Sequence, residues 1–276
     1  QISYIHGDHQ QAVQNGRPAR PQQATWRIVP LSYGEAWSDA RTPLADFFNG
    51  LLNREPATSQ PTRQPFLKGL YLVLDPTVRP DRPLPDLLRE AAAHGVRLFQ
   101  YRDKQATMRD AYAKALALRQ AATDAGALLI VNDRCDLAMA VNADGVHLGQ
   151  DDLPISYARR LMGPGKIIGL STHNAAQVRE AVTAQPDYVG FGPIFSTSTK
   201  ADHDPVVGLE GLRAARALTT LPMFAIGGIT AESVGEIMAA GADGVAVISA
   251  ILKAPDLGAA IRTFQQHLPT PDSQAP

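Results

Sequence analysis

The chain of 276 residues has little cysteine and no excess of charge of one sign. Its single cysteine, Cys135, excludes an internal disulfide framework and a zinc site built from cysteines, and it fits a reducing compartment. Lys and Arg number 26 against 27 Asp and Glu, so bulk charge gives no case for binding nucleic acid or an anionic membrane. No apolar run approaches the roughly 20 residues of a membrane span, and no signal-peptide region opens the chain. We therefore expect a cytoplasmic protein with no nucleic-acid or membrane partner.

Residues 1–65 differ from the rest of the chain. They are rich in Gln, Pro, Arg and Asn, and only residues 44–52 have the spacing of a short amphipathic helix. Residues 59–65 have the composition of a linker. The first residue is Gln1 instead of Met, which is typical of a fragment or a processed product. We predict a poorly structured extension, with the remnant of a preceding domain as the alternative, and a disordered tail over residues 269–276.

Residues 66–268 have a regular alternation of short apolar runs and amphipathic stretches. The apolar runs predict eight strands, at residues 69–74, 96–100, 128–131, 145–148, 167–170, 188–191, 223–226 and 244–248. The stretches between and after them predict helices, at residues 84–94, 108–125, 175–184, 209–218, 231–240 and 257–267. Eight βα units of this size predict an α/β fold, a compact TIM (β/α)8 barrel. A doubly wound open sheet is the alternative, but no G-x-G-x-x-G follows the first strand.

Residues 100–104 (QYRDK) close the second predicted strand with several polar side chains. Because side chains alternate along a strand, Gln100, Arg102 and Lys104 would share one face. Two cations and an amide at the end of a buried strand are costly unless an anion meets them, and Arg and Lys suit phosphate. The alternative is a polar strand end that frays into a solvated loop. On this stretch alone, the two interpretations are equally good.

Carboxylates follow the third and fourth predicted strands, where a TIM barrel has its active site. Asn132 and Asp133 end the third strand, and Asp151 and Asp152 follow the fourth. Two carboxylates with water and phosphate oxygens form a usual Mg²⁺ arrangement. The alternative is that each loop uses one Asp to cap the next helix, which leaves Asn132 and the second Asp unexplained.

The loops after the last three strands have the composition of phosphate sites. Hydroxyl groups and a cation follow the sixth strand, and small residues follow the seventh and eighth, at Thr197, Ser198, Thr199, Lys200, Gly227, Gly228, Ile248 and Ser249. TIM barrels frequently bind phosphate in the loops after strands seven and eight. The alternative for the sixth loop is a flexible Ser/Thr lid without a ligand.

Two histidines and the cysteine need separate interpretations. His147 lies in a predicted strand end, so a packed, hydrogen-bonded core histidine is the better interpretation. His173 lies in a loop, where both a structural and a catalytic role stay open. Cys135 opens a helix but has no paired histidine in evidence, so we expect a small buried residue.

Together these motifs resemble thiamine phosphate synthases. The resemblance runs from about residue 66 to about 267, and it is carried by residues 100–104 (QYRDK), 131–133 (VND), 144–152 (DGVHLGQDD), 192–195 (GPIF), 197–200 (TSTK) and 226–229 (IGGI). It implies a transferase on a TIM barrel. That enzyme couples 4-amino-2-methyl-5-hydroxymethylpyrimidine diphosphate to a thiazole phosphate, and diphosphate leaves before the thiazole nitrogen attacks.

The resemblance also implies a role for each residue that matches a family motif. Contacts to the pyrimidine diphosphate fall on Gln100, Arg102, Lys104, Asn132, Ser171 and Lys200, and contacts to the thiazole phosphate on Thr197, Thr199, Gly228, Ile248 and Ser249. Asp133 and Asp152 would hold Mg²⁺, which favours Asp152 over Asp151. The candidate catalytic residues are Arg102, Lys104, Ser171 and Lys200, and the attacking nitrogen carries no proton that a general base would have to remove.

Two other functions fit parts of this pattern. A thiazole tautomerase paralogue shares the barrel and the thiazole phosphate site but needs no complete diphosphate and metal cluster. A non-catalytic barrel could bind thiazole phosphate as a sensor or scaffold. The combination of Arg102, Lys104 and Asn132 with the two carboxylates favours the synthase. The sequence leaves the oligomeric state open, a homo-oligomer included.

Overall fold

The computed structural model describes residues 67–197 and 205–268. The chain divides into two units, Gln1–Ala57 and Thr58–Pro276, and the first lies wholly outside the described residues. The predictions made for the N-terminal extension and for the tail at 269–276 therefore remain untested.

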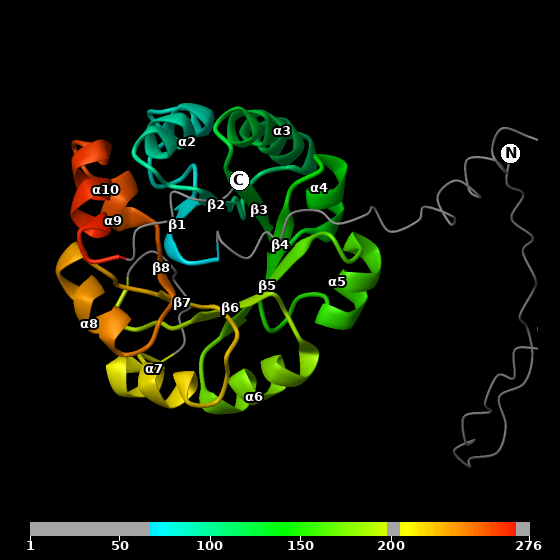
Figure 1. Ribbon diagram of the computed structural model, residues 1–276. Coiled ribbons are helices and arrows are strands. Elements are labelled where there is room, and N and C mark those ends of the chain that lie inside the picture. The colour runs from blue at the N-terminus through cyan, green and yellow to red at the C-terminus, as the bar shows by residue number, and fades with distance from the viewer. Residues whose placement is uncertain (1–66, 198–204, 269–276) are drawn as a thin grey trace, which may run out of the picture. The chain divides into compact units, whose positions relative to one another are not determined.

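Eight parallel strands form a closed barrel, each hydrogen-bonded to its neighbours in sequence and the eighth to the first (Figure 1). The strands are β1 (Gly69–Leu74), β2 (Leu98–Tyr101), β3 (Leu128–Asn132), β4 (Gly145–Leu148), β5 (Ile167–Thr172), β6 (Tyr188–Phe191), β7 (Met223–Ile226) and β8 (Gly244–Val247). Since every strand runs in the same direction, all carboxyl ends lie at one end of the barrel. The TIM barrel prediction is confirmed, and the open-sheet alternative is wrong.

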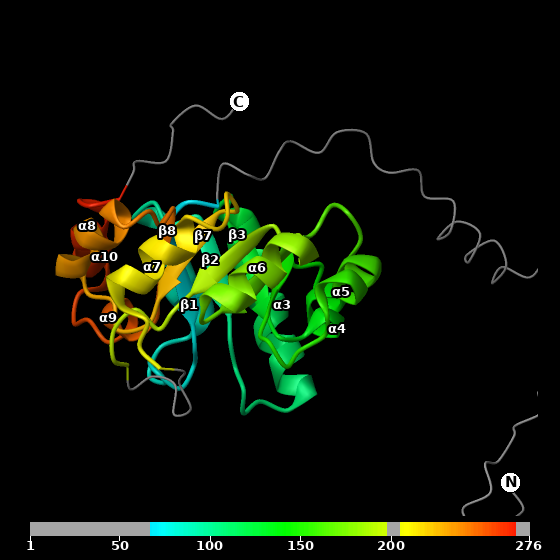
Figure 2. The same cartoon turned by 90° about the horizontal axis from the view of Figure 1, so that it is seen from below.

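Helices surround the strands, as the view along the barrel and the view turned by 90° both show (Figures 1 and 2). The described helices are α2 (Leu84–Ala93), α3 (Met108–Asp124), α4 (Cys135–Ala140), α5 (Ile155–Met162), α6 (Ala175–Ala184), α7 (Gly208–Arg216), the 3₁₀ turn η2 (Ala231–Ser233), α8 (Val234–Ala239), α9 (Ser249–Leu252) and α10 (Leu257–Gln265). The short helix α9 directly after β8 was not predicted.

Several predicted boundaries are corrected at element ends. Val96 was placed in the second strand, but its backbone N–H donates to Ala91 O and so completes the end of α2. The eighth strand was extended to Ile248, whose backbone (φ −123°, ψ −85°) leaves the extended conformation and introduces α9. The helix predicted at 231–240 begins as a 3₁₀ turn, because Thr230 and Ser233 form a capping box there. The helices predicted at 209–218 and 257–267 end two residues early, at Arg216 and Gln265.

The core has two layers that follow from the alternation of side chains along the strands. One face of the strands packs against the helices. The other fills the barrel with a cluster drawn from seven strands: Tyr71, Leu98, Leu128, Ile130, Ile167, Tyr188, Phe224 and Ala246. The aromatic rings of Tyr71, Tyr188 and Phe224 meet edge to face, with centroids 5.2–5.9 Å apart. The barrel is therefore a packed core that supports side chains at its mouth.

The same Asp–Arg pairing occurs three times at the amino-terminal end of the barrel. Asp144, Asp187 and Asp243 directly precede β4, β6 and β8, and each accepts a hydrogen bond from an arginine of an earlier helix. The same carboxylate oxygen accepts from a backbone N–H of an earlier strand, at 2.7–2.9 Å. These pairs tie helix, strand start and neighbouring strand together on the face opposite the carboxyl ends.

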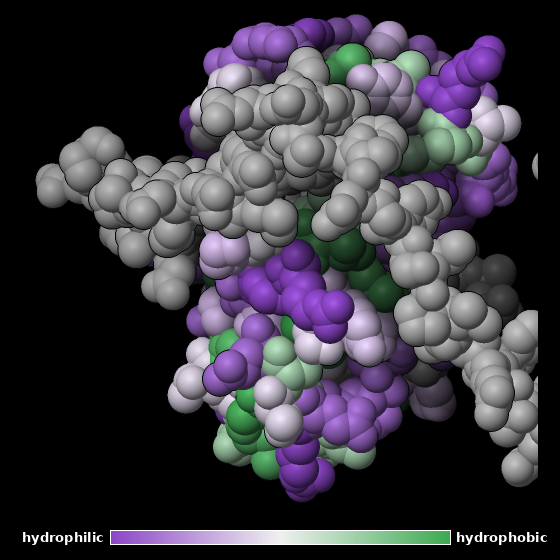
Figure 3. Space-filling view, turned by 90° about the vertical axis from the view of Figure 1, so that its right-hand side faces the viewer, coloured by the Kyte–Doolittle hydropathy of each residue, from purple (hydrophilic) through white to green (hydrophobic). Residues whose placement is uncertain are grey.

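The outer surface exposes several large hydrophobic residues. On the side of the barrel in Figure 3, hydrophilic residues predominate where the surface is visible. The exposed large apolar side chains of α3 and α5 include Tyr112, Leu116, Tyr157 and Leu161. Among the described helices, none is long and apolar enough to cross a membrane.

Candidate active site

The end of β2 directs alternate side chains to the barrel mouth, as the sequence predicts. Phe99 and Tyr101 pack outward in the layer under the helices, whereas Gln100 points inward and donates from Nε2 to Tyr71 Oη at 2.7 Å. Arg102 continues the strand ladder through its N–H to Leu74 O. Its guanidinium donates to Asp75 Oδ2 at 2.6 Å, and the Asp75 side chain is only 5% exposed. Arg102 is therefore held in place at the end of the strand, whereas Lys104 lies in the loop beyond it with its side chain 55% exposed.

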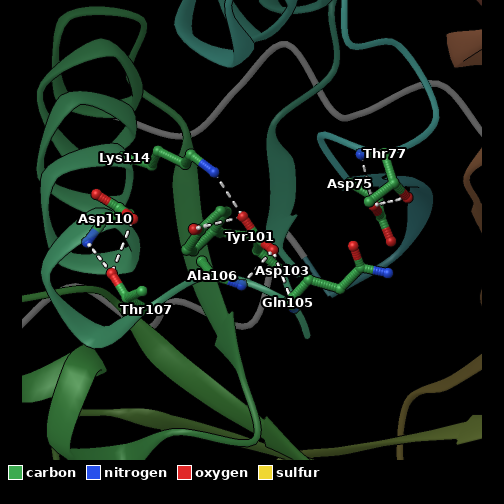
Figure 4. A network of polar contacts seen from close by, with 9 residues as sticks. All are labelled: Asp75, Thr77, Tyr101, Asp103, Gln105, Ala106, Thr107, Asp110 and Lys114. Atoms are coloured by element: carbon green, nitrogen blue, oxygen red, sulfur yellow. Dashed lines mark hydrogen bonds and ion pairs between the residues drawn. The ribbon is translucent and has the colours of Figure 1, made fainter.

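The loop between β2 and α3 is organised by Asp103 (Figure 4). Its side chain is buried, accepts from the backbone N–H groups of Gln105 and Ala106, and forms an ion pair with Lys114 at 2.7 Å. Burial alone would raise the pKa of Asp103, but these hydrogen bonds hold the pKa below its usual value. The loop that carries Arg102 and Lys104 is thereby fixed from its outer side.

The predicted metal ligands Asp133 and Asp152 lie together at the ends of β3 and β4. Lys104 reaches the same place, with Nζ 3.1 Å from Asp133 Oδ2. Neither carboxylate caps a helix: the N-caps of α4 and α5 are Arg134 and Pro154, without a side-chain capping bond. The capping alternative is therefore wrong. Asp133 has a φ of 61°, in the left-handed region where non-glycine residues are uncommon and often functional.

The two carboxylates lie close enough to affect each other's charge. Burial raises the pKa of Asp152, and the adjacent Asp133 carboxylate raises this pKa further against the hydrogen bond from Gly149 N–H. Such a pair of oxygen ligands suits a hard divalent cation, which would relieve their repulsion. Over residues 67–197 and 205–268, no group of three or more potential metal-ligating side chains occurs. The remaining ligands of a cation would have to come from water, amide oxygens or substrate.

A chain of buried hydrogen bonds connects the inward side chains of five strands. It runs from Gln100 through Tyr71 and Tyr188 to His147, whose Nε2 lies 2.9 Å from Ser171 Oγ. Burial lowers the pKa of His147 to about 4, so the imidazole is neutral at neutral pH. The interpretation of His147 as a packed core histidine is confirmed.

The loops after β6 and β7 pack tightly on one another. A Cβ atom on Gly228, whose φ is 65°, would lie 2.4 Å from Ser196 O and 2.8 Å from Phe195 Cβ. The close approach of the protein's own backbone therefore requires glycine at position 228, independently of any ligand. Thr197 lies at the end of this described loop, and Ile248 and Ser249 lie beyond β8, the latter as the first residue of α9. The predicted residues Ser198, Thr199 and Lys200 lie outside the described residues.

Several residues of this site were missed from the sequence. Asp75 and Tyr71 lie on β1, which carries no conspicuous polar motif, and Tyr188 begins β6 as one apolar residue among others. Only the closed barrel brings them next to Arg102, Gln100 and His147. His173, for which the sequence leaves both a structural and a catalytic role open, donates from Nδ1 to Gly192 O at 2.6 Å. Cys135 is buried, as expected, and burial raises the pKa of its thiol.

Fold and site together define a (β/α)8 barrel that gathers cationic and carboxylate side chains at the carboxyl ends of its strands. Comparison with known proteins narrows this class. Residues 70–251 match the family model described as thiamine monophosphate synthase. A thiamine-phosphate synthase of Methanoculleus marisnigri is 48% identical over 199 residues, 72% of this chain and 94% of the relative. One of Chloroflexus aurantiacus is 47% identical over 196 residues, 71% of this chain and 90% of the relative.

A solved structure agrees with the sequence relatives. The thiamine phosphate pyrophosphorylase of Pyrococcus furiosus superposes with a TM-score of 0.67 at 36% identity, covering 74% of this chain and 96% of that one. The chain belongs to the thiamine monophosphate synthase family, and its activity is that of a transferase that makes thiamine phosphate.

Proposed function

We propose that the carboxyl ends of β2–β5 bind the pyrimidine diphosphate with a magnesium ion, and that the loops after β6–β8 bind the thiazole phosphate. The observation that carries this proposal is the meeting of Lys104, Asp133 and Asp152 at one place, beside the anchored guanidinium of Arg102. Cations and a carboxylate pair at one site suit a diphosphate that arrives with a divalent cation.

The residues around the diphosphate would act on the bond that breaks. The carbon–oxygen bond between the pyrimidine methylene and the diphosphate breaks with its electron pair on oxygen, and the thiazole nitrogen then forms the new carbon–nitrogen bond. Arg102 and Lys104, with Lys200 from the sixth loop, would stabilise negative charge as it develops on the leaving group. Asn132 would add an amide contact, and no residue has to remove a proton from the attacking nitrogen.

Asp133 and Asp152 would hold the magnesium ion. Two carboxylates in mutual repulsion, one with a raised pKa, fit the donor set that Mg²⁺ takes from proteins. The bound cation would neutralise charge on the departing diphosphate. Their position next to Lys104 keeps both carboxylates at the diphosphate end of the site.

The pyrimidine ring of one substrate and the thiazole phosphate would be held by separate sets of residues. Gln100 and Ser171 would contact the pyrimidine ring, because both point inward at the ends of β2 and β5. Thr197, Ser198, Thr199, Gly227, Gly228, Ile248 and Ser249 would surround the thiazole phosphate. Short helices after β8 commonly take part in phosphate binding in this fold, and α9 begins at Ser249.

Binding measurements separate this function from the two alternatives. Each precursor is titrated alone into the full chain in a calorimeter, with and without Mg²⁺. A synthase binds both precursors, and the pyrimidine diphosphate binds at least tenfold more tightly with Mg²⁺. Binding of thiazole phosphate alone would favour a tautomerase-like protein or a sensor. Arg102→Ala should weaken only the pyrimidine diphosphate, and an effect confined to thiazole phosphate would contradict the proposed division of the site.

A cytoplasmic location completes the proposal. It is supported by the free, buried thiol of Cys135, which suits a reducing compartment, and is tested by fractionation of cells that make the protein.

A further inference from the structure

One continuous chain of hydrogen bonds crosses the barrel interior between two proposed substrate contacts. Gln100 Nε2 lies 2.7 Å from Tyr71 Oη, which lies 2.8 Å from Tyr188 Oη. Tyr188 Oη lies 2.9 Å from His147 Nδ1, and His147 Nε2 lies 2.9 Å from Ser171 Oγ. The three middle residues are buried, and burial raises the pKa of both tyrosines, so their hydroxyls are protonated donors.

The amide of Gln100 sets the direction of the whole chain. Its NH₂ group donates to Tyr71, so the Tyr71 hydroxyl must give its own hydrogen to Tyr188, its other partner. Tyr188 in turn donates to His147 Nδ1, which leaves the single N–H of the neutral imidazole on Nε2. That N–H donates to Ser171 Oγ, and the serine keeps its own hydrogen for another acceptor.

The two ends of the chain therefore present opposite polarity. No buried side-chain nitrogen or oxygen of the described residues lacks a hydrogen-bond partner. Among the described residues, no group donates a hydrogen bond to Gln100 Oε1. This oxygen can therefore accept a hydrogen bond from a bound molecule. Ser171, half-buried at the end of β5, presents a hydroxyl donor. An aminopyrimidine offers the complementary pair, an exocyclic N–H donor and a ring nitrogen acceptor.

We propose that Tyr71, Tyr188 and His147 are positioning residues that fix Gln100 as an acceptor and Ser171 as a donor, so that the site selects a 4-aminopyrimidine. This inference rests on the proposed function, because it assigns the pyrimidine to Gln100 and Ser171. The three positioning residues touch no substrate and act through the two residues at the ends.

Tight packing also fixes the positions of the hydrogen-bonded side chains. A Cβ atom on Gly169 would lie 2.2 Å from Tyr188 Cζ and 2.5 Å from His147 Nδ1. These two hydrogen-bonded side chains occupy the space that the Cβ atom of any residue other than glycine would need at position 169. The two rings lie 5.4 Å apart between centroids, so the phenol and the imidazole pack directly on this backbone.

Kinetics of single-oxygen deletions test the positioning role. Tyr188→Phe and Tyr71→Phe keep the packed rings and break the chain, and kcat/KM for the pyrimidine diphosphate should fall about tenfold, as expected for one lost hydrogen bond. KM for the thiazole phosphate should not change. The control is Tyr157→Phe, which removes the same hydroxyl from an exposed tyrosine of α5. Equal losses in Tyr188→Phe and Tyr157→Phe, or no loss in Tyr188→Phe, would overturn the proposal.

The direction of the chain is tested without turnover. Two-bond ¹H–¹⁵N correlations of the ¹⁵N-histidine-labelled full chain report the tautomer of His147, and the hydrogen should be on Nε2. Gln100→Glu replaces the amide by an acceptor, so the chain should reverse and the hydrogen should move to Nδ1. An Nδ1–H tautomer in the unmodified protein, or an unchanged tautomer in Gln100→Glu, would overturn the proposal. Absence of thiamine phosphate synthesis would contradict the proposed function and leave this tautomer result standing.

Discussion

The guanidinium of Arg102 and the carboxylate of Asp75 form an ion pair of 2.6 Å at the ends of adjacent strands β2 and β1. Asp75 also accepts from the backbone N–H and the hydroxyl of Thr77 through its other oxygen, Oδ1, so both carboxylate oxygens have partners. The pair fixes the guanidinium of Arg102 at a mostly buried strand end, at the place where we propose that the diphosphate binds.

Loss of the Asp75 charge should weaken the use of the pyrimidine diphosphate. In Asp75→Asn the guanidinium keeps its charge but loses its orientation, so kcat/KM should fall about tenfold, against about a hundredfold for Arg102→Ala. Steady-state kinetics with each substrate varied in turn measures this. Asp86→Asn is the control, because Asp86 pairs with Arg89 at 3.0 Å on the exposed surface. A loss of thiazole phosphate binding in Asp75→Asn would contradict the assigned role.

The carboxylate pair should control the dependence on magnesium. Asp133→Asn and Asp152→Asn each remove one charge, and asparagine tolerates the positive φ at position 133. We expect turnover to fall by about two orders of magnitude and the Mg²⁺ concentration at half-maximal rate to rise. Asp151→Asn, an exposed neighbour, should behave like the unmodified protein. Full activity without added metal in either variant would show that these residues hold no metal.

Burial of a neutral histidine should make stability depend on pH. The pKa of His147 falls from 6.5 in the unfolded chain to about 4 in the folded one. Below pH 6.5 His147 is therefore protonated in the unfolded chain but still neutral in the folded chain. As a result, the free energy of unfolding falls as the pH falls. Between pH 7 and pH 4 this contributes about 3 kcal/mol. Urea unfolding across this range should give a shallower pH dependence for His147→Gln, and identical slopes would contradict it.

The Asp–Arg pairs at the opposite end should affect stability alone. The side chains of Asp144, Asp187 and Asp243 are 9%, 38% and 43% exposed. Replacement by Asn should lower the free energy of unfolding most for Asp144, by about 2 kcal/mol, and less for the other two. KM values for both substrates should not change, since this end carries no site residue. A larger effect at Asp243 than at Asp144 would contradict the burial argument.

The sequence was most informative where local pattern and covalent order decide the structure. The alternation of side chains at residues 100–104 correctly predicted that Gln100 points inward and Tyr101 outward. Near-continuous apolar runs predicted every strand within about two residues, because a parallel barrel buries both faces of each strand. Gly95, Gly126 and Gly241 lie just past helices, where the pattern of apolar residues stops, and each has a positive φ.

What the sequence could not predict depends on contacts between distant strands. Asp75 and Arg102 are 27 residues apart, and Tyr71 and Tyr188 are 117 apart. Neither Asp75 nor either tyrosine belongs to a polar motif, so each has meaning only once the barrel closes. The capping of α4 and α5 was also undecided, because an aspartate before a helix has the same local pattern whether it caps the helix or turns toward a neighbouring strand.

The most direct test of the central claim is product formation by the full chain from the two phosphorylated precursors, with Mg²⁺ and after its removal by EDTA. We predict thiamine phosphate and diphosphate in equal amounts with Mg²⁺, and loss of both after chelation with recovery when Mg²⁺ is restored. Undiminished synthesis after chelation, or no thiamine phosphate from the intact chain with both precursors and Mg²⁺, would contradict the account.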